Sequence, residues 1–205
     1  MLRADVFFQA MALPYELITK TRVWEEHAAQ MALELPVGAR HVLDVGCGPG
    51  NSTAHLPAGS IGGDPALAML KRARKRGIVA LCLDAAKLPL RDGSLDAATF
   101  HSVLYLVPQP RATLFEVARC LRSGGRAVLL EPQRGARAVA LGLLRALRTP
   151  RWALTASLWR TMSTLYGGGF SRDDLRARLE AAGLRVLRIE EALGGLGLRA
   201  VAEKP

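Results

Sequence analysis

A short glycine-rich segment constrains this chain most. Residues 42–50 read VLDVGCGPG, so an apolar run carrying Asp44 leads directly into glycines at positions 46, 48 and 50. Such a sequence is typical of a buried strand followed by a loop whose bare backbone approaches a ligand. The segment therefore predicts a ligand-binding loop at the carboxyl end of a strand.

Apolar runs and helical patterns alternate after this segment. Strands are expected at residues 41–45, 60–64, 78–84, 95–102 and 126–132, and helices at 65–76 and 111–124. Between the first two strands, residues 51–56 leave room for only a very short helix before Pro57. Strands that alternate with helices predict a parallel sheet covered on both faces.

The two ends of the chain follow other patterns. Residues 14–35 have the apolar spacing of a helix that starts at Pro14. Ser171 is the expected N-cap of a helix that ends at Gly183. The strands expected at 184–192 and 195–203 are too close in sequence for a crossover helix, so they must pair antiparallel.

Length and composition limit the class of protein. A chain of 205 residues predicts a single domain. The sequence contains no run of about 18 apolar residues, so no transmembrane helix is predicted. The acid at Asp5 argues against a signal peptide. Cysteines 47, 82 and 120 are far apart, which fits neither a metal site nor a disulfide framework and indicates the reducing cytoplasm.

The chain is strongly basic, with a formal net charge of +10. Lysine occurs at only five positions, so 23 of the 28 basic residues are arginine. This charge permits acidic partners such as nucleic acid or anionic lipid without requiring one. The basic run at 71–76 is expected to be a solvated helix end, where cations suit the helix dipole.

Two interpretations of the glycine loop compete. A dinucleotide-binding loop has the spacing Gly-x-Gly-x-x-Gly, whereas the glycines here follow Gly-x-Gly-x-Gly. The helix that should hold a pyrophosphate is also very short. Asp44 places a negative charge beside the loop, which disfavours phosphate and suits a cation.

Five segments in order resemble the class I S-adenosylmethionine-dependent methyltransferases, in their small-molecule, quinone-biosynthesis-like branch. They are VLDVGCGPG, IGGDPALAML, LDAAKLPLRDGSLDAATFHSVLYLV, CLRSGGRAVLLEP and SRDDLRARLEAAGLRVLRIE, within residues 42–205. The resemblance implies a Rossmann-like three-layer sandwich with seven strands, mostly parallel, and an antiparallel C-terminal pair. The sequence GGDP, at residues 62–65, departs from the commoner Gly-hydrophobic-Asp of this family.

The resemblance also implies a cofactor, S-adenosylmethionine, and the residues that hold it. Asp64 would accept hydrogen bonds from the ribose hydroxyls, although taken alone it could be a helix N-cap. Asp84 would lie at the adenine, beside an apolar wall formed by Leu81 and Leu83. The full set of expected cofactor residues is Asp44, Gly46, Cys47, Gly48, Gly50, Asp64, Pro65, Met69, Asp84, Ala85 and His101.

Methyl transfer from a sulfonium mainly requires alignment and the exclusion of water. A hydroxyl or carbon acceptor would still benefit from a base. His101 is the first candidate because it follows the fourth strand, and Tyr105 and Tyr15 come next. The alternative is that His101 only packs against the cofactor or hydrogen-bonds to it. No metal is expected.

Residues 1–36 are expected to form a helical cap and residues 133–170 a helical insertion. Between Pro132 and Phe170 there is no acid but six arginines, and an arginine-rich helix over 134–148 is one possibility. Trp152, Trp159 and Tyr166 recur every seven residues, which places them on one helix face. The insertion is either a packed cover with a solvated basic side or a lid over the acceptor, and such a surface could touch anionic lipid.

The leading hypothesis is a methyltransferase for a small, apolar or amphipathic acceptor, as a monomer or a homodimer. An RNA methyltransferase is the first alternative, motivated by the charge. Against it, no RNA-binding domain is appended, and HSVL stands where an Asn-Pro-Pro-Tyr type motif would follow the fourth strand. A binding protein of the same fold that has lost catalysis is the second alternative.

Overall fold

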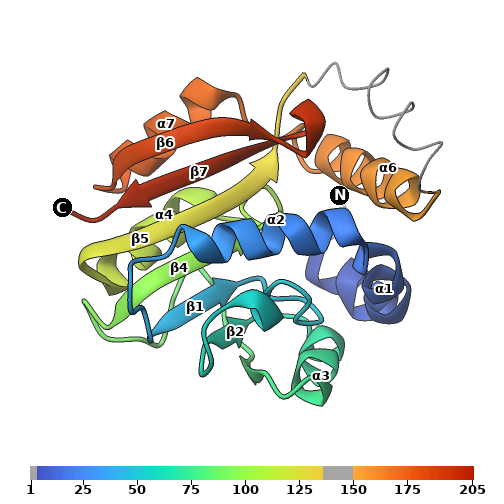
Figure 1. Cartoon of the computed structure of the whole chain (residues 1–205), viewed down its shortest axis with the longest axis horizontal. Helices are drawn as coiled ribbons and strands as arrows, with labels where there is room; N and C mark the ends of the chain where they lie inside the picture. The colour runs from blue at the N-terminus through green and yellow to red at the C-terminus, as the bar shows by residue number, and fades with distance from the viewer. Residues whose placement is uncertain (1–3, 136–149) are drawn as a thin grey trace.

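The computed structural model describes residues 4–135 and 150–205 and forms one seven-stranded sheet (Figure 1). The strand order is β3-β2-β1-β4-β5-β7-β6. The strands are β1 (Val42–Val45), β2 (Ile61–Gly63), β3 (Val79–Leu81), β4 (Leu95–His101), β5 (Leu121–Pro132), β6 (Arg185–Ala192) and β7 (Gly197–Glu203). The first five strands are parallel, and β7 runs antiparallel to both β5 and β6. The predicted Rossmann-like sheet with an antiparallel C-terminal pair is confirmed.

Helices cover both faces of the sheet. They are α1 (Ala4–Thr19), α2 (Arg22–Leu33), α3 (Leu67–Lys75), α4 (Pro110–Cys120), α6 (Pro150–Leu165) and α7 (Arg172–Ala181). Leu43 of β1 packs in the same apolar cluster as α4 and α7, whereas its neighbour Val42 packs with α2 and α6. This alternation produces the two cores of a three-layer sandwich. No helix in the two described ranges is long and apolar enough to cross a membrane.

The N-terminal helical region differs from its prediction. Two helices replace the single helix expected from Pro14, and Pro14 lies inside α1. The break follows Thr19 because Thr21 adopts an extended conformation and its hydroxyl accepts a hydrogen bond from Trp24 N at 3.4 Å, as an N-cap does. The predicted helix over 134–148 falls almost wholly on residues 136–149, which lie outside the described residues.

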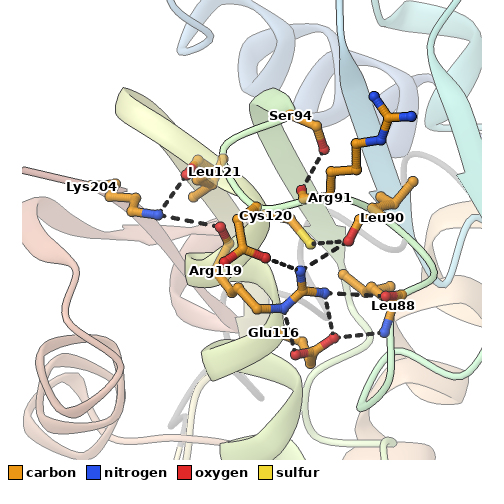
Figure 2. Close-up of polar contacts among 10 residues, drawn as sticks. Leu88, Leu90, Arg91, Ser94, Glu116, Arg119, Cys120, Leu121 and Lys204 are labelled. Carbon is orange, nitrogen blue, oxygen red and sulfur yellow. Dashed lines mark hydrogen bonds and ion pairs between the residues drawn. The ribbon is translucent and has the colours of Figure 1, made fainter.

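Helix α4 ends four residues before the predicted Gly124. Leu121 already pairs with Leu95 of β4, so β5 begins there. The Lys204 ammonium donates to the backbone oxygens of Arg119 and Leu121, at 3.3 and 2.7 Å (Figure 2). Long-range pairing therefore overrides the local helical pattern. At the other end of the sheet, β2 and β3 are three residues each, and residues 53–55 form a single 3-10 turn.

A glycine turn fixes the end of β5 against the linker between α6 and α7. Phe170 N donates to Pro132 O at 2.9 Å, and Arg134 N donates to Phe170 O at 2.8 Å. Gly169 precedes this contact with a φ of 75°, and a Cβ there would lie 2.3 Å from Pro132 O. Only glycine fits this approach of two backbone segments.

We expect Gly169→Ala to lower the free energy of unfolding by about 3 kcal/mol, since left-handed strain and a backbone clash add. Gly168→Ala is the matched control, because Gly168 has a similar φ of 79° but no atom lies within 4 Å of its added Cβ. The control should lose only about 1 kcal/mol. Urea denaturation measures both values, and equal losses would contradict the close approach.

Candidate cofactor-binding site

The glycine loop lies at the carboxyl end of β1 and turns back toward β2. Gly46 N and Cys47 N both donate to Gly63 O, at 2.7 and 3.0 Å. The glycines at 46, 48 and 50 all have positive φ. A Cβ on Gly46 would lie 2.5 Å from the Val103 side chain, so the loop also packs against the segment that follows β4. The predicted loop and its place in the sheet are therefore observed.

Asp64 connects this loop to the start of α3. Its carboxylate accepts hydrogen bonds from Gly48 N at 3.0 Å and Ala66 N at 2.8 Å. The N-cap of α3 is Ala66, so the alternative role of Asp64 as the N-cap of this helix is not observed. Burial raises the pKa of Asp64, while the two N–H groups oppose that rise. Each oxygen carries one of these bonds, so both retain acceptor capacity for a hydroxyl.

Asp44 is a second buried acid next to the loop. Its carboxylate accepts hydrogen bonds from the hydroxyls of Thr53 and Thr99, at 2.6 and 2.8 Å. Burial raises the pKa of Asp44 to about 6, and the charge of Asp64 adds to the rise. Burial also raises the pKa of the Cys47 thiol, which keeps it protonated. Two carboxylates beside the loop favour a cationic ligand over a phosphate.

The expected adenine corner is more open. Asp84 is exposed, and its carboxylate accepts a hydrogen bond from Ala86 N at 2.9 Å. Leu83 is buried, but Leu81 is 41% exposed, so of the two only Leu83 offers a buried apolar wall. Among the other expected residues, Ala85 is half-buried, Pro65 is exposed and Met69 is buried against Ala12 of α1.

An arginine holds the segment after Asp84 in place. Figure 2 shows the Arg119 guanidinium between Glu116 and the carbonyl oxygens of Leu88 and Leu90. Glu116 in turn accepts a hydrogen bond from Leu88 N at 2.8 Å. These bonds connect α4 to the loop between β3 and β4 and hold that loop in place.

His101 is buried at the end of β4. Its ring stacks on Trp24 of α2 with centroids 4.3 Å apart, and its Nδ1 hydrogen-bonds with the Ser52 hydroxyl. Its Nε2 has no hydrogen-bond partner in the part of the chain that the structure describes. Burial lowers the pKa of His101 to about 3, helped by His27 and His55. A group with this pKa is a weak base near neutral pH.

Tyr15 and Tyr105 line a small cavity together with Trp24, on which His101 stacks. Burial raises the pKa of both phenols, with a further contribution from Asp64 at Tyr15. The Tyr105 hydroxyl also hydrogen-bonds with Ser102. The cavity has a volume of about 20 Å³, enough for roughly one water. It is lined by Phe8, Tyr15, Thr19, Trp24, Ser102, Tyr105, Leu106, Leu158, Trp159 and Met162.

Glu131 is an important residue that the sequence interpretation missed. It is completely buried in β5, and its carboxylate accepts hydrogen bonds from Val103 N, Leu104 N and Tyr105 N at 3.0, 2.8 and 3.4 Å. Burial raises its pKa to about 8. An acid inside the apolar run VLLEP was the available signal. Nothing in the sequence pattern indicated that Trp24 would stack on His101.

Helix α1 lies beside α3 (Figure 1). Glu16 of α1 forms ion pairs with Arg72 and Arg76 of α3, and the Arg74 guanidinium donates to Ala80 O at 2.7 Å. The basic run at 71–76 was predicted to be a solvated helix end. Instead, three of its arginines bind Glu16 or the oxygen of Ala80. These ion pairs hold α1 over Met69 and beside Gly48, where Tyr15 lies 3.9 Å from the position of an added Cβ.

Comparison with known proteins agrees with this geometry. A family model described as a methyltransferase domain matches residues 43–129. The chain is 31% identical to a demethylmenaquinone methyltransferase from Mycobacterium sp. (strain KMS) over 216 residues, covering 97% of this chain and 92% of that protein. It is also 41% identical over 101 residues to an uncharacterized transposon protein from Streptomyces fradiae, covering 44% of this chain but only 29% of that protein.

A solved structure gives the same fold. A SAM-dependent methyltransferase from Thermotoga maritima, described as a possible histamine N-methyltransferase, superposes with a TM-score of 0.72 at 23% identity, over 98% of this chain and 99% of that one. The chain therefore belongs to the class I S-adenosylmethionine-dependent methyltransferases, in the branch similar to the quinone-biosynthesis enzymes.

Proposed function

We propose that this methyltransferase acts on a small, apolar or amphipathic acceptor. The observation that carries the proposal is the aromatic-lined cavity beside the glycine loop, where Tyr15, Trp24 and Tyr105 from three different elements meet. Its aromatic lining suits contact with an apolar ring or chain, and because its volume is only about 20 Å³, the lining side chains must move apart to admit one. The demethylmenaquinone methyltransferase relative, named for an apolar ring substrate, supports the same class.

We assign the cofactor residues as follows. The Gly46–Gly50 loop lies against the methionine part, and Asp64 accepts the ribose hydroxyls with the capacity that its two backbone bonds leave free. Ala85 and Leu83 contact the adenine, with Asp84 at its edge. When bound, S-adenosylmethionine supplies an activated methyl group. The negative charges of Asp44 and Asp64 suit its positive charge.

The protein's own contribution is alignment and exclusion of water. His101 stays neutral, and Tyr15 and Tyr105 stay protonated, so we propose that they hydrogen-bond to and orient the acceptor rather than carry a proton away at neutral pH. Helices α1 and α2 form the cap over the aromatic-lined cavity, and α6 closes a further side of that cavity. Trp152 lies in the part of α6 where only the backbone is described. The three free cysteines fit a reducing compartment, which we propose is the cytoplasm.

The arginine content does not by itself favour an RNA substrate. At least twelve arginines form ion pairs within the described residues. A paired guanidinium attracts a phosphate backbone less than a free one. The cavity, and not the net charge, therefore supports the proposed acceptor site.

We expect Asp64→Asn to raise the Kd of S-adenosylmethionine at least about tenfold, because hydrogen bonds from the ribose to a charged acceptor are lost or weakened. Isothermal titration calorimetry measures this value. Asp173→Asn, at an exposed position in the first turn of α7, is the control and should bind like the wild type. An unchanged Kd in a natively folded Asp64→Asn protein would contradict the assignment.

Glu131 should make stability depend on pH. The carboxyl ionises near 4.5 when unfolded and near 8 when folded, so between these values the folded state binds more protons. The stability of the wild type relative to Glu131→Gln should therefore fall as pH rises, by at most about 1.4 kcal/mol per pH unit. Urea titrations from pH 4.5 to 8 test this, with exposed Glu180→Gln as the control that parallels the wild type. Parallel curves for Glu131→Gln would refute it.

Methyl transfer itself identifies the acceptor class. The protein is incubated with methyl-labelled S-adenosylmethionine and a cell extract, and the products are separated into lipid, small-molecule, RNA and protein fractions. We expect label in the lipid or small-molecule fraction, and less of it with Asp64→Asn. Label confined to RNA would overturn the proposed acceptor class and leave the methyltransferase assignment intact.

A further inference from the structure

A second and larger cavity lies at the carboxyl end of β5, where α6 approaches the sheet (Figure 1). Its volume is about 260 Å³, compared with about 20 Å³ for the inner cavity beside Tyr105. Its walls include Gln133, Arg134, Trp159, Arg160, Ser163 and Leu196. Trp159 lines both cavities and therefore lies between them, so a single elongated ligand that occupied both would displace this side chain.

Among the described residues, the outer cavity is lined by two arginines, Arg134 and Arg160, and by no acid. Arg134 donates to Gly169 O at 3.0 Å and lies 3.4 Å from Asp174, which Arg178 also binds at 2.9 Å. Asp174 is thus shared between two guanidinium groups. Arg160 is exposed and has no acidic partner in residues 4–135 and 150–205. The cavity therefore has an excess of positive charge.

Two polar atoms of the lining are buried without a partner among the described residues. They are Trp159 Nε1, on a side chain that is 5% exposed, and Gln133 Oε1. The other end of the Gln133 amide donates to Glu191 at 3.4 Å. A buried indole N–H without an acceptor costs free energy, and an oxygen of a ligand would relieve it. Hydroxyls of Ser163 and Thr164 also line the cavity and can donate.

We propose that the outer cavity binds an oxyanion, a carboxylate or a phosphate, carried by the acceptor molecule. Arg160 and Arg134 hold the anion, and the apolar part of the acceptor extends past Trp159 toward Tyr105. This inference rests on the proposed small-molecule function and adds that the acceptor is an anionic amphiphile. Arginine at such a site suits both oxyanions, because its planar fork matches carboxylate and phosphate geometry.

The test uses three probes with one tail: octanoate, octyl phosphate and neutral octan-1-ol. Each is titrated calorimetrically into the full chain in the presence of S-adenosylhomocysteine. At least one anion should bind about tenfold more tightly than octan-1-ol, and Arg160→Gln should abolish that preference. Arg160→Lys should keep part of it. Arg176→Gln is the matched control, since Arg176 is exposed on α7 and pairs with Glu180.

The relative affinities of the two anions separate a carboxylate from a phosphate, and either order supports the site. Equal binding of all three probes, absence of binding, or an anion preference that survives Arg160→Gln would overturn it. The proposed function is judged separately by the labelled-methyl experiment. Label in small molecules without an anion preference would refute only the outer site, whereas an Arg160-dependent preference with label confined to RNA would refute only the proposed acceptor class.

Discussion

Two buried carboxyl groups, those of Asp64 and Glu131, hold the loops between which we propose that the cofactor binds. The strand order reverses between β1 and β4, so the loops that follow these strands diverge and leave a crevice. Asp64, just after β2, binds backbone N–H groups of the first loop, and Glu131 of β5 binds those of the second. Because each carboxyl group accepts hydrogen bonds from backbone N–H groups of the neighbouring loop, it fixes that loop against the adjacent strand. The positions of Gly48 and Tyr105 depend on these bonds.

Burying these acids has an electrostatic consequence for the ligand. The pKa values of Asp44, Asp64 and Glu131 are all raised by burial, which means that their negative charge is incompletely compensated. A phosphate beside Asp44 and Asp64 would add to that repulsion, whereas a cation would relieve it. The same electrostatics explain why a glycine loop on a Rossmann-like sheet can serve a sulfonium nucleoside and not a dinucleotide.

Local patterns predicted the strands, the antiparallel C-terminal pair and the Ser171 N-cap, whose hydroxyl accepts a hydrogen bond from Asp174 N at 3.1 Å. Each of these features depends on residues close together in the chain. The features that were missed depend on distant residues. Lys204 and Leu95 decide where α4 ends, and Glu16 neutralises arginines about sixty residues away. The stack of Trp24 on His101 joins two elements that share no sequence motif, so no pattern could have indicated it.

The arginines show the same distinction between composition and position. A net charge of +10 predicts an affinity for polyanions only if the cations are free and lie together on one surface. Here Arg72 and Arg76 hold α1, Arg119 holds the loop after Asp84, and Arg122 binds Asp96. These guanidinium groups stabilise contacts between elements of the fold. An arginine without an acidic partner keeps its charge available for a ligand. Arg160 has no such partner among the described residues, and it lines a cavity large enough for part of a small molecule.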